Sequence, residues 1–263
     1  MPATAEVPTV RCSDLATDRY GAVVWQRIDA HLLVDSGSCS LVGVGVHGDA
    51  TVAAGAELQL VRSSIHGDVD SAGVFRVIAG TVDGDISTSR PPGSRPYVTL
   101  DHAHVQGGLT GSASSYVVHD STVVGAVDVT ETEAVSLYFS FLGGSVSART
   151  TVAFASERST VTGDLSVSGA STLYTRLCTS TVHGDLTLSG AEGPVGLATV
   201  DADGHPCPST VDGSVHVTGS SGDVTIGRLF VKGDLACTGN TGPGGVVLLA
   251  GVSVRGTRSG QCA

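Results

Sequence analysis

Residues 159–167 read STVTGDLSV, and residues 180–188 read STVHGDLTL. Their shared core, Val-x-Gly-Asp followed by Leu or Val, returns in about eleven imperfect copies along the chain. Self-similarity at a short period is the signature of a repeat architecture, in which stacked copies bury one continuous core. The motif glycines have a mean spacing of about 21 residues; they are Gly48, Gly67, Gly84, Gly107, Gly125, Gly143, Gly163, Gly184, Gly213, Gly233 and Gly256.

Apolar and polar residues alternate on both sides of each motif glycine. In the copy at Gly184, Val182 lies two residues before the glycine and Leu186 lies two residues after it. Period two is the pattern of a strand with one buried face, and a second apolar pair, such as Leu58/Leu60, precedes the motif in several copies. We therefore predict an all-β fold, a right-handed parallel β-helix (β-solenoid) of about eleven rungs.

The repeat also predicts the domain organisation and the corners. We expect residues 1–40 to form an N-terminal cap, over which Trp25 covers the open core, and residues 41–263 to form a single solenoid domain. The Gly-Asp step is expected to turn the chain, because glycine adopts backbone conformations closed to other residues and aspartate bonds nearby amides. The Ser/Thr pairs before the motif, such as Ser159-Thr160, suit an outer surface or hydroxyl ladders.

Composition excludes several function classes. The chain has 14 basic and 25 acidic residues, a net charge of −11, which argues against nucleic acid as a partner. No apolar run approaches membrane-spanning length, so we expect no membrane insertion. Motifs of serine hydrolases, phosphate-binding loops and zinc proteases are missing, and we expect neither a cofactor nor a metal site.

Six cysteines follow the phase of the repeat. Two lie six residues before a motif glycine on adjacent rungs, a separation that suits a disulfide. Two more follow consecutive motif glycines by four and six residues, and the last two lie near the predicted cap. Six free buried thiols are the alternative. The predicted disulfides are Cys12–Cys39, Cys178–Cys207 and Cys237–Cys262, the last of which would staple the C-terminal end.

The predicted disulfides bear on the compartment. Disulfides form and persist in oxidising environments, so we expect a secreted protein. The first residues, MPATAE, lack a basic region followed by an apolar stretch, so the signal peptide would have been lost or replaced. A cytoplasmic location is the alternative.

Two regions resemble a known group of proteins. CSL at residues 39–41 with VHGD at residues 46–49, and VKGDLACTGN at residues 231–240 with GQC at residues 260–262, are similar to exported actinobacterial β-solenoid repeat proteins. The resemblance implies the solenoid fold and export, and it supplies no catalytic residues. The repeat also resembles, more weakly, that of the polymer-forming bactofilins, although the cysteines and the irregular spacing argue against that group.

The middle copies lose the Gly-Asp step and gain ring and charged side chains. Gly107-Gly108, Gly125-Ala126 and Gly143-Gly144 replace it. Five to six residues before the glycines of these copies and the next one, we expect one contiguous strip on four successive rungs, a candidate site for general acid–base chemistry. Solvated corner residues are the alternative. The members of this middle-rung strip are Asp101, His102, His119, Asp120, Tyr138, Glu157 and Arg158.

Six further side chains could border the strip and contribute to binding. One of them, Tyr116, also falls in an apolar column with Phe75 and Phe154, where interior stacking is the alternative. The six candidates are Tyr97, His104, Tyr116, Arg149, Tyr174 and Arg176.

Two functions remain open at this point. The first is a secreted, non-catalytic solenoid that binds a small molecule or polysaccharide or helps to build a surface, with lateral or end-to-end oligomers as an option. The second is a β-helix enzyme, either a lyase or hydrolase of polysaccharide or a cyclase or isomerase of a small metabolite. Its site would lie on the middle-rung strip.

Overall fold

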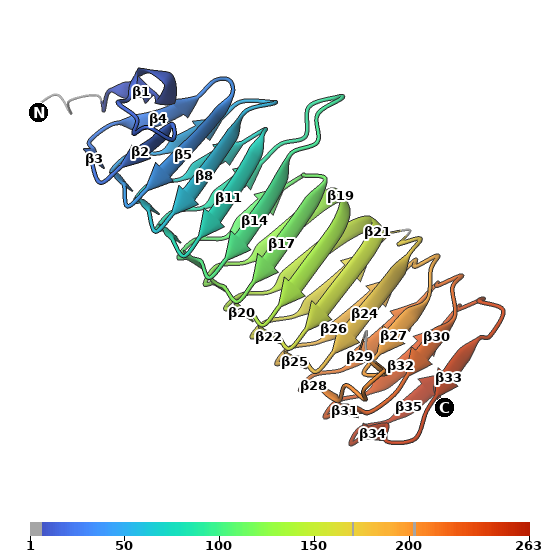
Figure 1. Cartoon of the computed structure of the whole chain (residues 1–263). Coiled ribbons are helices and arrows are strands. Elements are labelled where there is room, and N and C mark those ends of the chain that lie inside the picture. Colours follow the sequence, from blue (N-terminus) through green and yellow to red (C-terminus); the bar gives the residue numbers. More distant parts are fainter. Residues whose placement is uncertain (1–6, 170, 202–203) are drawn as a thin grey trace, which may run out of the picture.

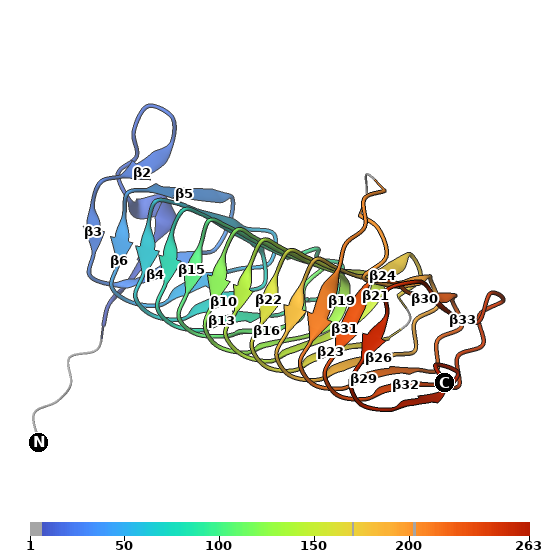
Figure 2. The same cartoon turned by 90° about the horizontal axis from the view of Figure 1, so that it is seen from below.

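The computed structural model describes residues 7–169, 171–201 and 204–263. The chain winds into an elongated β-solenoid of about 13 turns with about 19 residues per turn. Its strands form a 23-stranded and a 12-stranded sheet in which successive turns pair in parallel (Figures 1 and 2). The predicted fold class is confirmed.

Each turn has three faces, and the first carries the longest strands (Figure 1). The strands β19 (Val127–Tyr138) and β21 (Val146–Glu157) run without a break from the third face onto the first. The other strands of the first face are β2 (Ala22–Val24), β5 (Ser38–Val42), β8 (Glu57–Val61), β11 (Val74–Ile78), β14 (Tyr97–Asp101), β17 (Ser115–His119), β24 (Tyr174–Cys178), β27 (Val195–Leu197), β30 (Val224–Ile226) and β33 (Val246–Leu248).

The second face consists of short strands that lie side by side (Figure 2). They are β3 (Arg27–Ile28), β6 (Gly45–Val46), β9 (Ser64–Ile65), β12 (Thr81–Val82), β15 (His104–Val105), β18 (Thr122–Val123), β20 (Phe141–Leu142), β22 (Thr160–Val161), β25 (Thr181–Val182), β28 (Ser209–Val211), β31 (Leu229–Val231) and β34 (Ser253–Val254).

The third face follows the Gly-Asp step, and a short 3₁₀ helix, η1 (Cys12–Asp14), lies after its first strand. Its strands, besides the first halves of β19 and β21, are β1 (Thr9–Arg11), β4 (His31–Val34), β7 (Ala50–Val52), β10 (Val69–Ser71), β13 (Ile86–Thr88), β16 (Leu109–Gly111), β23 (Leu165–Ser168), β26 (Leu186–Ser189), β29 (Val215–Thr218), β32 (Leu235–Thr238) and β35 (Arg258–Gly260).

The solenoid has more turns than the eleven glycines indicate. Parallel stacking already begins inside residues 1–40, the segment assigned to a cap. There β1 pairs with β4, and β3 pairs with β6 of the next turn. Ala30 lies below Gly48 in the motif column, so an alignment on glycine misses this turn. Trp25 does not cover the core: its side chain is 76% exposed on a corner of the coil.

One middle copy is shifted by one residue from the sequence alignment. Phe141 and Leu142 pair with Thr122 and Val123, so Gly144, and not Gly143, occupies the motif column. Leu142 is fully buried, whereas Phe141 is exposed. Because side chains alternate between the two faces of a strand, this slip of one residue exchanges the inner and outer positions of the copy. The adjacent Gly-Gly pair made both alignments possible.

The core is a continuous stack of small branched side chains along the axis, mostly Val and Leu. The alternating burial of each strand, for example buried–exposed–buried in β10, places these residues inward as the period-two pattern predicts. Three rings, Phe75, Tyr116 and Phe154, are the largest fully buried side chains. They occupy the apolar column predicted for interior stacking.

The corner between the second and third faces, which we call the Gly-Asp corner, is held by carboxylates. Asp164 Oδ1 accepts a hydrogen bond from the Asp185 amide at 2.9 Å, and Asp185 Oδ1 accepts one from the Ser214 amide at 2.7 Å. The motif glycines have no positive φ, contrary to expectation. They are needed for close approach: a Cβ on Gly184 would lie 2.7 Å from the Gly163 carbonyl carbon.

All three predicted disulfides are present. The Cα–Cα distances are 6.0 Å for Cys12–Cys39, 4.9 Å for Cys178–Cys207 and 5.2 Å for Cys237–Cys262. Such bonds are typical of an oxidising, extracellular environment. Within the described part of the chain, no helix has the length and apolar character needed to cross a membrane.

Candidate functional site

The corner between the first and second faces, which we call the serine corner, has an unusual backbone. Among the described residues, eight of the ten non-glycine positions with positive φ stack in one column here, with φ between 47° and 52°. This left-handed conformation costs an L-residue about 1–2 kcal/mol. The eight residues, which we call the corner column, are Trp25, Arg62, Ala79, His102, Asp120, Phe139, Arg158 and Thr179.

Buried serines directly follow five of the eight residues, Arg62, Asp120, Phe139, Arg158 and Thr179, and help their backbone to hold the conformation. Ser140 Oγ donates to the Tyr138 carbonyl at 2.7 Å and accepts from the Ser121 amide of the preceding turn at 3.3 Å. The hydroxyls of Ser63, Ser121, Ser159 and Ser180 repeat this double role, and Ser209 Oγ accepts from the Ser180 amide at 3.1 Å. The ladder comprises Ser63, Ser121, Ser140, Ser159, Ser180 and Ser209, each at most 4% exposed.

The structure brings the middle-rung strip together along the serine corner. Asp101 pairs in register with His119, His119 with Tyr138, and Tyr138 with Glu157, so these four residues form one column at the end of the first face. His102, Asp120 and Arg158 occupy the adjacent corner column. The strip is therefore two columns wide and four turns long.

Its first two turns contain a chain of alternating carboxylate and imidazole groups. Asp101 Oδ1 lies 2.8 Å from His119 Nδ1 and 2.9 Å from His102 Nδ1. The second ring nitrogen of His102, Nε2, lies 3.0 Å from Asp120 Oδ2. Both nitrogens of His102 thus face carboxylate oxygens.

The contacts around Asp101 shift the pKa of its carboxyl group. The hydrogen bond from His119 lowers the pKa of the Asp101 carboxyl below its ordinary value, burial acts in the opposite direction, and His102 lowers it further. A carboxylate that stays ionised can orient an imidazole ring and stabilise a positive charge on it. The pair Asp101–His119 has the chemistry of an oriented general base or a metal ligand set.

The third and fourth turns add rings and a guanidinium. Phe139 is 50% exposed, its ring lies edge-on to His119 with centroids 5.9 Å apart, and the Arg158 guanidinium lies 5.1 Å from its centroid. Phe139 was not among the predicted residues, because the one-residue slip at Gly143 hid its place in the corner column. The adjacent Gly143-Gly144 pair was the signal that could have revealed it, because it allows a second alignment in which Phe139 falls in the corner column.

The far end of the strip is closed by an ion pair. Glu157 pairs with Arg176, whose guanidinium also lies 5.9 Å from the ring centroid of Tyr174. Burial raises the pKa of Tyr174, and Tyr138 raises it further. Arg176 therefore reaches the strip through Glu157, whereas Tyr174 lies at the opposite end of β24, in the same column as Tyr97.

The other predicted border residues are dispersed. Tyr97 lies at the opposite end of β14 from Asp101, under the Arg76 guanidinium at 4.8 Å. His104 is exposed on the second face, and Arg149 is exposed on the third-face half of β21. Tyr116 is only 1% exposed, and its hydroxyl bonds Thr88 inside the coil. It belongs to the core and cannot border the strip, because its ring points inward.

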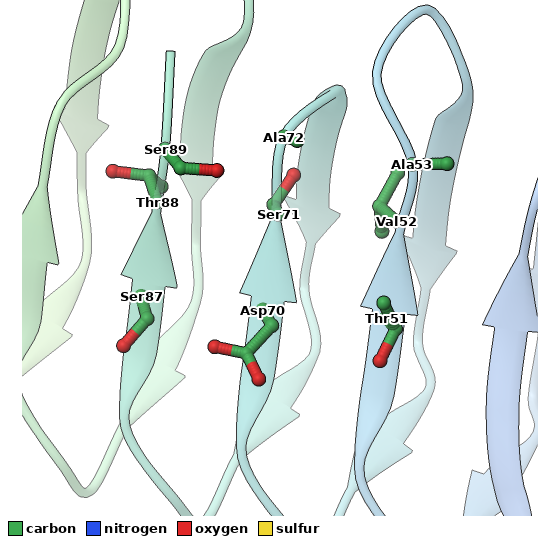
Figure 3. A pocket seen from close by; sticks show the side chains of 9 residues that line it. All are labelled: Thr51, Val52, Ala53, Asp70, Ser71, Ala72, Ser87, Thr88 and Ser89. Atoms are coloured by element: carbon green, nitrogen blue, oxygen red, sulfur yellow. The ribbon is translucent and has the colours of Figure 1, made fainter. Parts of the chain in front are cut away.

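Three hollows in the surface are lined by residues outside the strip, and the one of about 320 Å³ lies on the serine corner at Arg62 and Ala79. One of about 260 Å³ opens on the third face of the N-terminal half, where β7, β10 and β13 lie side by side (Figure 3). Asp70 is its one charged lining residue, and the rest are Ser, Thr, Ala and Val, so it carries little chemistry. The strip instead runs along the serine corner, where the side chains of His102, Asp120 and Arg158 are exposed.

Comparison with known proteins adds no candidate function and no candidate site residue. No protein-family model, no curated protein and no solved structure matches the chain.

Proposed function

We propose that the protein is a secreted β-solenoid whose middle-rung strip binds a polysaccharide or a smaller glycan. One observation carries the proposal: ring and charged side chains that are dispersed in sequence gather into one exposed strip on a rigid corner. Aromatic faces stack on apolar sugar faces, and carboxylate and guanidinium groups bond hydroxyls. Export agrees with the disulfides and with the resemblance to exported repeat proteins.

The shape of the site favours a ligand that lies along the surface over one that is enclosed in a cavity. The strip follows an outer corner, so a long ligand can lie along it without threading through a cavity. The stacked turns fix the spacing of its side chains, because each turn hydrogen-bonds its neighbours. A preorganised surface of this kind loses little conformational entropy when it binds.

Phe139→Ala tests the proposal, with soluble neutral, acidic and amino-sugar polysaccharides as probes in isothermal titration calorimetry. Removing the exposed ring is expected to weaken binding at least tenfold, about 1.4 kcal/mol. Trp25→Ala is the matched control, since Trp25 is an exposed aromatic residue in the same corner column outside the strip. No binding by the wild type, or equal losses in both variants, would contradict the proposal.

A second candidate, a β-helix enzyme, is favoured by the Asp101–His119 pair. The contact through Nδ1 directs the other ring nitrogen, Nε2, to proton transfer with a substrate. A lyase would abstract a proton beside a uronate carboxylate, and a hydrolase would activate water. This reading uses the same strip as the binding proposal.

The two candidates separate in one experiment. The combined change His102→Ala, His119→Ala, Asp120→Asn and Arg158→Ala is compared with the wild type for release of reducing ends and of unsaturated sugars from the same polysaccharides. An enzyme loses product formation in the variant, whereas a binding protein forms no product in either form. Unchanged product formation in the variant would exclude the strip as a catalytic site.

A further inference from the structure

We propose that Asp101, His102 and His119 bind a divalent transition-metal ion, Zn²⁺ foremost, at the N-terminal end of the middle-rung strip. This inference deepens the proposed function, on which it rests for the role of the strip in ligand binding. It replaces the sequence-based expectation that the chain has no metal site.

The ligand atoms are already close to one another. One ring nitrogen of His102, one ring nitrogen of His119 and a carboxylate oxygen of Asp101 lie within 4.8 Å of one another. A tetrahedral site with bonds of about 2.0–2.1 Å places its ligand atoms roughly 3.3 Å apart. The hydrogen-bonded contacts of 2.8 and 2.9 Å would lengthen only slightly to admit an ion. Within residues 7–169, 171–201 and 204–263, these residues form the one such group of three.

The chemistry of the donor set selects the metal. Two imidazole nitrogens and one carboxylate oxygen suit Zn²⁺ and its neighbours, whereas Ca²⁺ and Mg²⁺ prefer oxygen ligands alone. Three protein ligands leave a coordination position for water or a ligand hydroxyl. Side-chain exposures of 58% for His102 and 43% for His119 keep that position accessible from solvent.

Asp120 provides a second, independent observation. Its Oδ2 lies 3.0 Å from His102 Nε2, the ring nitrogen that does not face Asp101. Ligating histidines commonly donate their other N–H to a carboxylate, which fixes the ring orientation and raises the basicity of the ligating nitrogen. Asp120 is therefore placed as a positioning residue.

The backbone holds the ligands in place before a metal binds. His102 and Asp120 occupy consecutive turns of the corner column with φ of 51° and 47°. Beneath them Ser121 Oγ donates to the His119 carbonyl at 2.7 Å and accepts from the Ala103 amide at 2.9 Å. The site thus rests on the serine ladder, and its two carboxylates attract a cation.

The test is isothermal titration of Zn²⁺ into the full chain without a histidine tag, at neutral pH. We expect one equivalent to bind the wild type, and Co²⁺ to give the visible spectrum of a tetrahedral site. His119→Ala should abolish binding, and Asp120→Asn should weaken it 10–100-fold while the Co²⁺ spectrum keeps its tetrahedral shape. His183→Ala is the control, because His183 faces Asp212 at 2.8 Å on another corner.

Circular dichroism and thermal unfolding verify that each variant folds. Failure of the wild type to bind one equivalent, or wild-type binding by His119→Ala, would overturn the inference. The outcome is separable from that of the proposed function. Zn²⁺ binding without polysaccharide binding leaves the metal site standing, and polysaccharide binding that depends on Phe139 without Zn²⁺ binding removes the metal site alone.

Discussion

The Gly-Asp corner and the serine corner turn the same coil by opposite means. At the Gly-Asp corner, solvent-exposed carboxylates accept backbone amides, and glycine is required because adjacent turns come too close for a Cβ. At the serine corner, the hydrogen bonds are made inside the coil by a buried hydroxyl ladder, and the strained residue above it keeps its side chain.

The difference determines where the sequence can vary. The exposed groups of the Gly-Asp corner hold the backbone, so its motif is conspicuous from copy to copy. At the serine corner the buried hydroxyls hold the backbone, so the outward side chains are free to differ between turns. His102, Asp120, Phe139 and Arg158 occupy these outward positions. The conspicuous repeat and the candidate site therefore occupy different corners.

The largest expected effect comes from adding a methyl group at the Gly-Asp corner. In Gly184→Ala, the new Cβ would lie 2.7 Å from the Gly163 carbonyl carbon and 2.8 Å from the Asp164 amide nitrogen, both backbone atoms. We expect a loss of about 3 kcal/mol in the free energy of unfolding, measured by denaturant titration.

Gly196→Ala is the control for this change. Its Cβ would meet only the Thr199 side chain, at 3.1 Å, which can move. The variant should lose less than about 1 kcal/mol. Similar losses at both positions would refute the close-approach explanation.

Removing one hydroxyl from the serine ladder is the next largest change. Ser140→Ala takes the acceptor from the buried Ser121 amide, and an unsatisfied buried donor costs about 2 kcal/mol. Asp164→Ala removes the equivalent acceptor at the exposed Gly-Asp corner, where water replaces it at a cost below about 1 kcal/mol. Equal destabilisation in chemical denaturation would contradict the larger cost assigned to the buried hydrogen bond.

Relieving the strained backbone should have a smaller effect of opposite sign. Ala79 has φ of 52° in the corner column and an exposed side chain outside the strip. Glycine adopts this conformation freely but loses more entropy on folding, so Ala79→Gly is expected to raise the free energy of unfolding by up to about 1 kcal/mol. A clear loss in thermal unfolding would show that the positive φ of Ala79 stores no strain that glycine can relieve.

The smallest effect is a difference in acid sensitivity. Hydrogen bonds from the Thr257 amide and hydroxyl lower the pKa of Asp234, at the Gly-Asp corner, below its ordinary value of 3.8. The folded state therefore binds this proton less readily than the unfolded state, so Asp234 stabilises the fold above pH 3.8, and the contribution is lost as pH falls through the lowered pKa.

Asp234→Asn removes the titrating group and keeps an acceptor oxygen. Urea unfolding at a series of pH values should show a smaller acid-induced loss in the variant than in the wild type. The serine ladder contains no titrating group, so Ser140→Ala should leave the pH profile unchanged. A larger acid-induced loss of the free energy of unfolding in Asp234→Asn would contradict the lowered pKa of Asp234.

Much of the fold was predictable because burial imposes a strict period. The alternation around Val182 and Leu186 defined the strands, and the phase of Cys178 and Cys207 identified a disulfide between neighbouring turns. The number of turns was underestimated because Ala30 replaces the glycine that marked each copy. The role of that glycine was misjudged because contacts between turns leave no trace within a single copy.

The candidate site was predictable in position but not in detail. Column counting placed Asp101, His119 and Glu157 on neighbouring turns, since stacking aligns equivalent residues. It failed at Gly143, where two adjacent glycines left the register open and Phe139 was lost. It could not anticipate the His102–Asp120 contact, which depends on the positive φ of the corner column.

The corner column also bears on how a repetitive polymer could lie on this protein. Successive turns present their side chains at intervals of about 4.8 Å, so a periodic chain laid along the corner could shift by one turn and meet an equivalent backbone. The side chains forbid that sliding, because His102, Asp120, Phe139 and Arg158 offer a different chemistry at each step. An aperiodic edge on a periodic scaffold gives such a chain a single alignment and a direction.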